Sequence, residues 1–190
     1  MRFATMIARF TGTHVPAAIL FCLAAPTALE GQKGGAGKSD EAAFLRAVGE
    51  HFGTPRSEVQ VLTRWSLSAR EIPVVLRLAK RAGVSPDVVV AKRRQGEGWM
   101  EIAHGYSVHA GDFHVPVDGS TGFLSAAYER FGARPASEWR DISLSDAEVV
   151  GLVNVRFLSR ALDLRPGRVV EAMGDGTDIV GVFIRLRGGG

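Results

Sequence analysis

The chain has 190 residues, of which 46% are apolar, and a formal net charge of +3. This length allows one ordinary domain or two small ones that share a core, and the apolar fraction excludes disorder of the whole chain. Arg2 and Arg9 belong to a predicted leader, and without it 21 basic and 19 or 20 acidic side chains remain, a net charge of +1 to +2. Such a small charge does not indicate a nucleic-acid or membrane partner.

Residues 1–31 have the pattern of a secretory signal peptide. A positively charged start precedes an uncharged, largely apolar run over residues 15–25, and small residues follow where a signal peptidase could cleave. The run is shorter than the roughly 20 residues of a membrane-spanning helix. Cys22, the single cysteine, lies in this run without the small preceding residue of a lipoprotein signal. We therefore predict cleavage within residues 25–33 and export to the periplasm or the medium; the alternative is an uncleaved anchor or a buried helix.

A Gly-rich segment over residues 32–38 predicts a flexible linker. Its end, Gly34–Ser39, partly resembles a phosphate-binding loop. That motif requires a glycine where this chain has Gln32, and a hydrophobic strand ahead of the loop. We therefore interpret the segment as a linker and predict no cofactor.

Every element predicted after the linker is a helix. Pro55 and Pro86 occupy first helical positions, and Gly83 supplies a stop. Ser68 and Glu71 form a capping box ahead of the third helix, and Pro73 is an alternative mark of where that helix begins. No pair of alternating runs is joined by a hairpin turn, so the predicted class is all-α. The helices of the first half are expected over about 40–52, 55–65, 69–82, 86–93 and 99–103.

The same signals return in the same order in the second half of the chain, at offsets of 77 to 80 residues. We therefore predict two diverged copies of one helical unit, about 51–107 and about 130–187, joined by a loop over 108–122. The alternative is that two unrelated helical segments share caps and glycines. Because neither copy can bury its apolar faces alone, residues 39–190 are expected to form a single domain, a compact bundle of short helices. The matching segments are 52–53 with 131–132, 66–71 with 143–148, 81–82 with 160–161, 86–90 with 166–170, and 96–98 with 174–176.

The densest group of possible metal ligands is His104, His109 and His114, with Asp112 between them. Imidazole and carboxylate groups suit zinc or a similar ion. These residues lie along a Gly-rich stretch and do not share one face of a helix. The second copy contains no histidine. We therefore predict solvated loop histidines, with no catalytic, cofactor-binding or metal-binding residue. The alternative function is a metal-dependent envelope hydrolase that uses the His104–His114 loop.

Residues 85–103 contain a helix that ends in glycines, followed by Trp99-Met100-Glu101-Ile102-Ala103. This Gly-x-Gly-Trp-x-Glu-Ile-Ala segment resembles the repeat of uncharacterised exported bacterial proteins. The resemblance extends only in part to residues 166–179, where Thr177 replaces the tryptophan. It implies export and helical repeats, and no established activity.

Residues 85–103 also resemble the first part of a DNA-binding helix-turn-helix. The recognition helix would have to form over 108–119, where Gly111, Pro116 and Gly119 interrupt it. DNA binding is therefore the third hypothesis. The leading one is a non-catalytic interaction or structural module of the cell envelope, with a protein partner favoured over a small molecule or a nucleic acid.

Trp99 is predicted to be a core residue. It precedes Ile102 by three positions, so both side chains can face Val89 and Val90. The basic run 92–94 is expected to form the solvated face of its helix.

Overall fold

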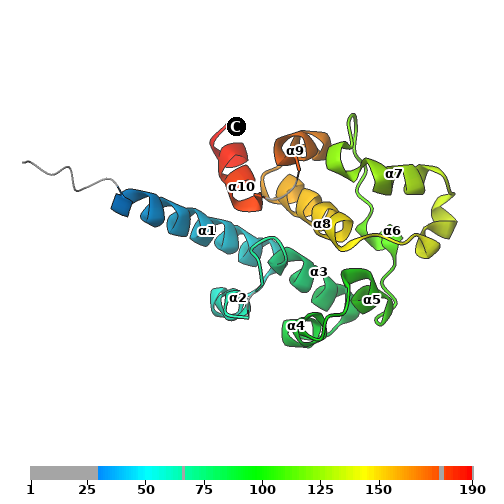
Figure 1. Ribbon diagram of the computed structural model, residues 1–190, viewed down its shortest axis with the longest axis horizontal. Coiled ribbons are helices and arrows are strands. Elements are labelled where there is room, and N and C mark those ends of the chain that lie inside the picture. The colour runs from blue at the N-terminus through cyan, green and yellow to red at the C-terminus, as the bar shows by residue number, and fades with distance from the viewer. Residues whose placement is uncertain (1–29, 66, 176–177, 190) are drawn as a thin grey trace, which may run out of the picture.

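The computed structural model describes residues 30–65, 67–175 and 178–189. Within these ranges every regular element is a helix and the bundle is compact, which confirms the predicted all-α class (Figure 1). The predicted signal peptide lies, up to residue 29, outside the described residues. None of the described helices is long and apolar enough to cross a membrane. The elements are α1 (Glu30–Phe52), α2 (Arg56–Thr63), α3 (Ile72–Ala82), α4 (Pro86–Arg94), α5 (Trp99–His104), α6 (Ala110–Phe113), η1 (Gly122–Leu124), α7 (Ser125–Gly132), η2 (Ala136–Asp141), α8 (Asp146–Ala161), α9 (Pro166–Met173) and α10 (Ile179–Gly188).

Helix α8 is at the centre of the fold. It contacts α1, α3, α5, α6 and α9, and its residues from Val149 to Val155 are all buried. A helix with apolar groups on all sides must be surrounded by other elements. The buried side chains of the first and second halves form one continuous hydrophobic cluster around it.

Helix α1 packs against the C-terminal half of the chain. The Phe44 ring meets Phe157 of α8 and Phe183 of α10 edge to face, each at a centroid distance of 5.7 Å. In Figure 1 the first turns of α1 extend beyond the other helices. The structure differs here from the predicted flexible linker, because Gln32–Lys38 is part of α1. Glycines weaken a helix but keep the backbone N–H donor, so a helix anchored by its buried later turns can continue through them.

The start and stop signals act largely as predicted. Ser145 and Glu148 form a capping box at α8, in which the Glu148 amide donates to the Ser145 hydroxyl at 3.3 Å. Gly83 ends α3 in the left-handed region, with φ of 68°. Ser68 donates its backbone N–H to the Glu71 carboxylate at 3.1 Å, and α3 begins at Ile72, which agrees with the alternative start marked by Pro73. Proline at the second helical position explains this start, because it has no N–H to donate to an earlier carbonyl.

The predicted loop over 108–122 is not wholly irregular, since it contains the single-turn helix α6. The backbone N–H of His109 donates to the Asp112 carboxylate at 2.9 Å and thereby caps this turn. Buried Ala110 and Phe113 attach it to the core. Glycine content therefore misled the prediction, because two apolar anchors and one cap are sufficient for a single turn.

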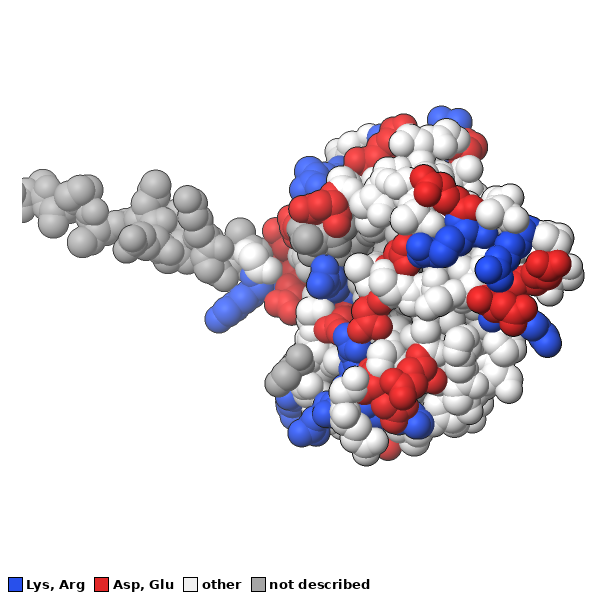
Figure 2. Space-filling model, turned by 45° about the vertical axis from the view of Figure 1, so that its right-hand side comes forward, with Lys and Arg blue, Asp and Glu red and all other residues white. Residues whose placement is uncertain are grey.

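Charged groups of both signs are mixed on the face of the molecule that Figure 2 shows, where acidic side chains lie among the basic ones. This mixture agrees with the small formal net charge of +3. A local excess of one sign therefore has to be sought among particular neighbouring helices.

Candidate functional site

His114 is part of an aromatic cluster. Its ring centroid lies 4.3 Å from that of Trp139, 4.9 Å from Phe131 and 5.6 Å from Tyr128. Burial, with a smaller contribution from the charge of Arg156, lowers the pKa of His114. The prediction of a solvated loop histidine is therefore wrong for this residue.

The other possible metal ligands of this loop have separate contacts. The rings of His104 and His109 are 5.9 Å apart, and the Asp112 carboxylate pairs with Arg81. Among the described residues, no group of three or more His, Cys, Asp and Glu side chains is placed to hold a metal ion. The structure therefore does not assemble the His104–His114 loop as a metal centre.

The segment where a helix-turn-helix would have its recognition helix is instead a short turn packed on the core. Helix α6 has four residues, and both Ala110 and Phe113 are buried. A recognition helix needs an exposed face long enough to enter the major groove. A buried single turn does not offer one.

Basic side chains gather where α3 and α8 pack side by side. Arg77 and Arg81 are one turn apart on α3, and Arg156 and Arg160 are one turn apart on α8. Lys80 extends the α3 row and is exposed, as is Arg160. We call these five residues the basic face. Within the described part of the chain, these residues form a single ion pair, between Arg81 and Asp112.

Two of these arginines hold the loop that contains α6. Arg77 donates to the backbone carbonyl of Asp112 at 2.5 Å, and Arg156 donates to the same carbonyl at 3.4 Å. Arg156 also donates to the carbonyl of His114. These guanidinium groups satisfy carbonyls at the C-terminal end of α6, where cations are favoured. Carbonyls are dipoles without net charge, however, so the positive charge of the basic face remains largely uncompensated.

Burial, together with this concentration of positive charge, lowers the pKa of two members of the basic face and of a neighbouring histidine. Burial, followed by the charges of Arg156, Arg81 and Arg160, lowers the pKa of Arg77 to about 10. Burial and neighbouring arginines also lower the pKa of Arg156. His51, near the end of α1, has its pKa lowered by burial and then by Arg160, Lys80 and Arg77. Each shift has the direction expected when like charges are held close together in a partly desolvated place.

The predicted repeat matches Arg81 with Arg160, but it does not reveal that these positions lie together in the basic face. Arg77 and Arg156 are separated by 79 positions, and so are Arg81 and Arg160. This separation lies within the offsets of the predicted repeat. Packing α3 against α8 thus brings equivalent positions of the two proposed copies together.

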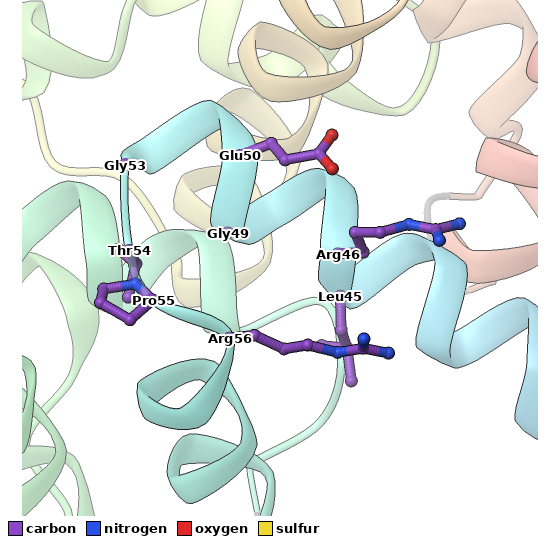
Figure 3. Close-up of a pocket in the computed structure, with 8 residues that line it drawn as sticks. All are labelled: Leu45, Arg46, Gly49, Glu50, Gly53, Thr54, Pro55 and Arg56. Carbon is purple, nitrogen blue, oxygen red and sulfur yellow. The ribbon is translucent and has the colours of Figure 1, made fainter.

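A groove lies between α1 and α2, with a cavity of about 490 Å³. Arg46 of α1 and Arg56 of α2 extend in the same direction beside Leu45 (Figure 3). A Cβ at Gly49 would come within 3.0 Å of the Thr54 carbonyl, so glycine allows the turn to lie close to α1. Glu50 also lines this groove. The mixed charges here give it a weaker electrostatic preference than the basic face has.

The basic run 92–94 was expected to be solvated, but Arg93 is engaged in the structure. Its guanidinium lies 2.6 Å from the Asp146 carboxylate and 3.3 Å from that of Glu71. It also lies over the Trp99 ring, 4.5 Å from the centroid. Arg93 is therefore a structural link between α4 and the start of α8.

No family model matches the chain, and neither a curated protein nor a solved structure matches it. The resemblance of residues 85–103 to exported bacterial repeat proteins therefore remains a prediction. The function has to be argued from the site itself.

Proposed function

We propose that the protein is a non-catalytic interaction module of the cell envelope, and that its basic face binds an acidic partner protein. The observation that carries this proposal is the clustering of five cations that share a single ion pair within the described residues. Charges of one sign held at neighbouring positions favour a partner of the opposite sign and accelerate its association. The signal-peptide pattern of residues 1–31 supports the envelope location.

Binding suits these residues better than catalysis. Guanidinium groups remain protonated at neutral pH and are poor general bases. His51, whose pKa these cations help to lower, packs against Phe52 and Phe157 at centroid distances of 4.7 and 5.3 Å. Its ring is thereby engaged in packing. The groups of the His104–His114 loop likewise serve caps and an aromatic cluster.

We also infer that the two halves descend from one duplicated unit. Helices α3, α4 and α5 occur in the same order as α8, α9 and α10. Proline is the first residue of both α4 and α9. Ser68 and Ser145 donate their backbone N–H groups to Glu71 and Glu148 at 3.1 and 2.7 Å, respectively. On this view duplication doubled a pair of arginines and created the basic face.

The test uses a short fluorescent peptide of glutamate residues, with a glutamine peptide of equal length as the neutral probe. The protein should bind the glutamate peptide at low ionic strength and lose it at high ionic strength. Lys80→Gln combined with Arg160→Gln removes two exposed charges and should weaken binding about three- to tenfold. The matched control combines Arg46→Gln with Arg56→Gln, at the groove of Figure 3, and should leave the affinity unchanged. Equal weakening in both double variants, or none in the first, would show that the basic face is not the binding surface.

A further inference from the structure

A cavity of about 530 Å³ opens beside the basic face. It lies between the chain that follows α6, the C-terminal end of α8 and the start of α9. This volume is within the range of small-molecule sites. Its lining residues are Val115, Pro116, Arg156, Ser159, Arg160, Asp163, Leu164 and Pro166.

The lining combines two chemistries. Val115, Pro116, Leu164 and Pro166 provide apolar surface. From one turn of α8, Arg156 and Arg160 add positive charge and Ser159 adds a hydroxyl. Asp163 contributes a carboxylate, so the cavity holds two cations and one anion. A ligand that matches this lining has an apolar body and an anionic group.

Ser159 gives an independent indication of a ligand. The residue is only 8% exposed, and its Oγ has no hydrogen-bond partner within the described part of the chain. The buried Nε of Arg156 is unpartnered there as well. A serine inside a helix usually bonds the carbonyl one turn earlier, and buried polar groups without partners are costly and rare. Two such donors belong to neighbouring lining residues of the same cavity.

We propose that this cavity binds a carboxylate attached to an apolar group. The carboxylate would accept hydrogen bonds from Ser159 and Arg156 and pair with Arg160, while the apolar group would pack against Leu164 and Pro166. Such a carboxylate occurs free, as in a short fatty acid, or as the C-terminal residue of a protein chain. The proposal rests on the proposed function in one respect, because Arg156 and Arg160 are also members of the basic face.

Calorimetric titration with octanoate and with N-acetyl-leucine distinguishes the two sources. The neutral comparison compounds are octanamide and N-acetyl-leucinamide. We expect one of the carboxylates to bind more tightly and its amide to bind at least tenfold more weakly, because a guanidinium–carboxylate pair is lost. Preference for octanoate indicates a free acid, and preference for N-acetyl-leucine indicates a C-terminus. Absence of binding by both carboxylates, or equal binding of the amides, would overturn the proposal.

Ser159→Ala should weaken carboxylate binding about three- to tenfold, since one hydrogen bond is removed. Its melting temperature should not fall, because the hydroxyl has no partner to lose. Arg160→Gln, at an exposed position, should also weaken binding and covers the case in which the alanine variant does not fold. The control is Arg165→Gln, whose side chain is 82% exposed and does not line the cavity. Unchanged affinity in folded Ser159→Ala and in Arg160→Gln would contradict the assignment.

Two single variants separate this site from the proposed function. Lys80→Gln should weaken binding of the glutamate peptide and leave binding of the carboxylate ligand unchanged. Ser159→Ala should do the reverse. Loss of the carboxylate site with retained peptide binding would reject the cavity alone, and the opposite pattern would reject the basic face alone.

Discussion

Trp99 is fully buried, which confirms its predicted place in the core. Its substitution by alanine should cost about 3–5 kcal/mol of unfolding free energy, because it removes a large side chain from a packed site. The indole Nε1 has no hydrogen-bond partner in the described part of the chain, so Trp99→Phe should cost less than that. Urea denaturation measures both values. A midpoint unchanged by Trp99→Ala would show that the indole is exposed.

Trp139 provides the contrasting case among single residues. Its Nε1 donates to the carbonyls of Phe131 and Arg134, at 3.0 and 3.2 Å. Trp139→Phe should therefore lower stability through lost hydrogen bonds, by about 0.5–1.5 kcal/mol for each. Denaturation of the two phenylalanine variants side by side tests whether partnered and unpartnered indoles differ. A larger loss of unfolding free energy in Trp99→Phe than in Trp139→Phe would contradict the contacts described.

His51 and His114 should make stability depend on pH. Burial lowers the pKa of each below the ordinary value of 6.5, and positive neighbours lower it further. The unfolded chain then takes up protons at a higher pH than the folded one, so stability is complete above about pH 6.5 and declines as the pH falls below it. Replacing both histidines by glutamine should flatten this decline in melting temperature. The same replacement of exposed His104 should leave the decline in place.

The prediction for Trp99 was confirmed and that for His114 was wrong, because the neighbours that bury the two residues lie at different distances along the chain. Trp99 could be assigned to the core from Ile102 on its own helix. The surroundings of His114 come from Phe131 and Trp139, which are 17 and 25 positions away. Spacing within a loop cannot indicate which distant rings will cover it. A polar residue that can be a ligand is therefore uninformative until its neighbours in space are known.

Asp146 joins three helices. It is the first residue of α8, and its carboxylate accepts from the Trp99 amide of α5 at 2.7 Å and from Arg93 of α4 at 2.6 Å. Asp146→Ala should cost about 1–3 kcal/mol, because it leaves the part-buried Trp99 amide without this acceptor and removes the shorter of the two ion pairs of Arg93.

Asp118 supplies the matched control for this prediction. Its pair with Arg165 is longer, 3.5 Å, and both side chains are largely exposed. Exposed pairs contribute little, so Asp118→Ala should change stability by less than about 1 kcal/mol. Equal effects of the two substitutions in chemical denaturation would show that Asp146 is not a junction.

Helix starts were predictable where the signal is local, and less so where packing decides. Pro86 opens α4 and Ser145 caps α8, because a missing donor and a hydroxyl act within one turn. The beginning of α1 was not predictable, because contacts of Phe44 with distant rings stabilise that helix in spite of its early glycines. Helix α6 was missed for the same reason, since Phe113 is held by the core.

The basic face could be predicted only by knowing which helices pack together in the whole molecule. Residues 66–71 match 143–148 in the predicted repeat, but a match between copies does not indicate that they touch. Contact between α3 and α8 turns two separate pairs of arginines into one charged surface. The cavity beside it needs a third segment, the chain after α6. Local sequence patterns do not determine which segments pack together, so each further segment makes such a site harder to predict.

The two halves are bound together by contacts that neither could make alone. Phe44, from the first half, lies between Phe157 and Phe183 of the second. The buried side chain of Asn154 donates to the backbone carbonyl of Arg70 at 2.8 Å. Splitting the chain between the halves would therefore expose aromatic rings and leave a buried amide donor without this acceptor.

We therefore expect the fragments Gln32–Gly122 and Thr121–Gly190 to be poorly folded when expressed separately, and the joined chain to unfold in one transition. Short helices are marginal in water when shorter than about 12–15 residues, so packing between the halves must supply much of their stability. Circular dichroism of each fragment and calorimetry of the joined chain test this expectation. Two independent transitions, or native helicity in the first fragment alone, would mean autonomous domains. That result would contradict the continuous core, because a cluster shared by both halves cannot lose one of them without exposing the other.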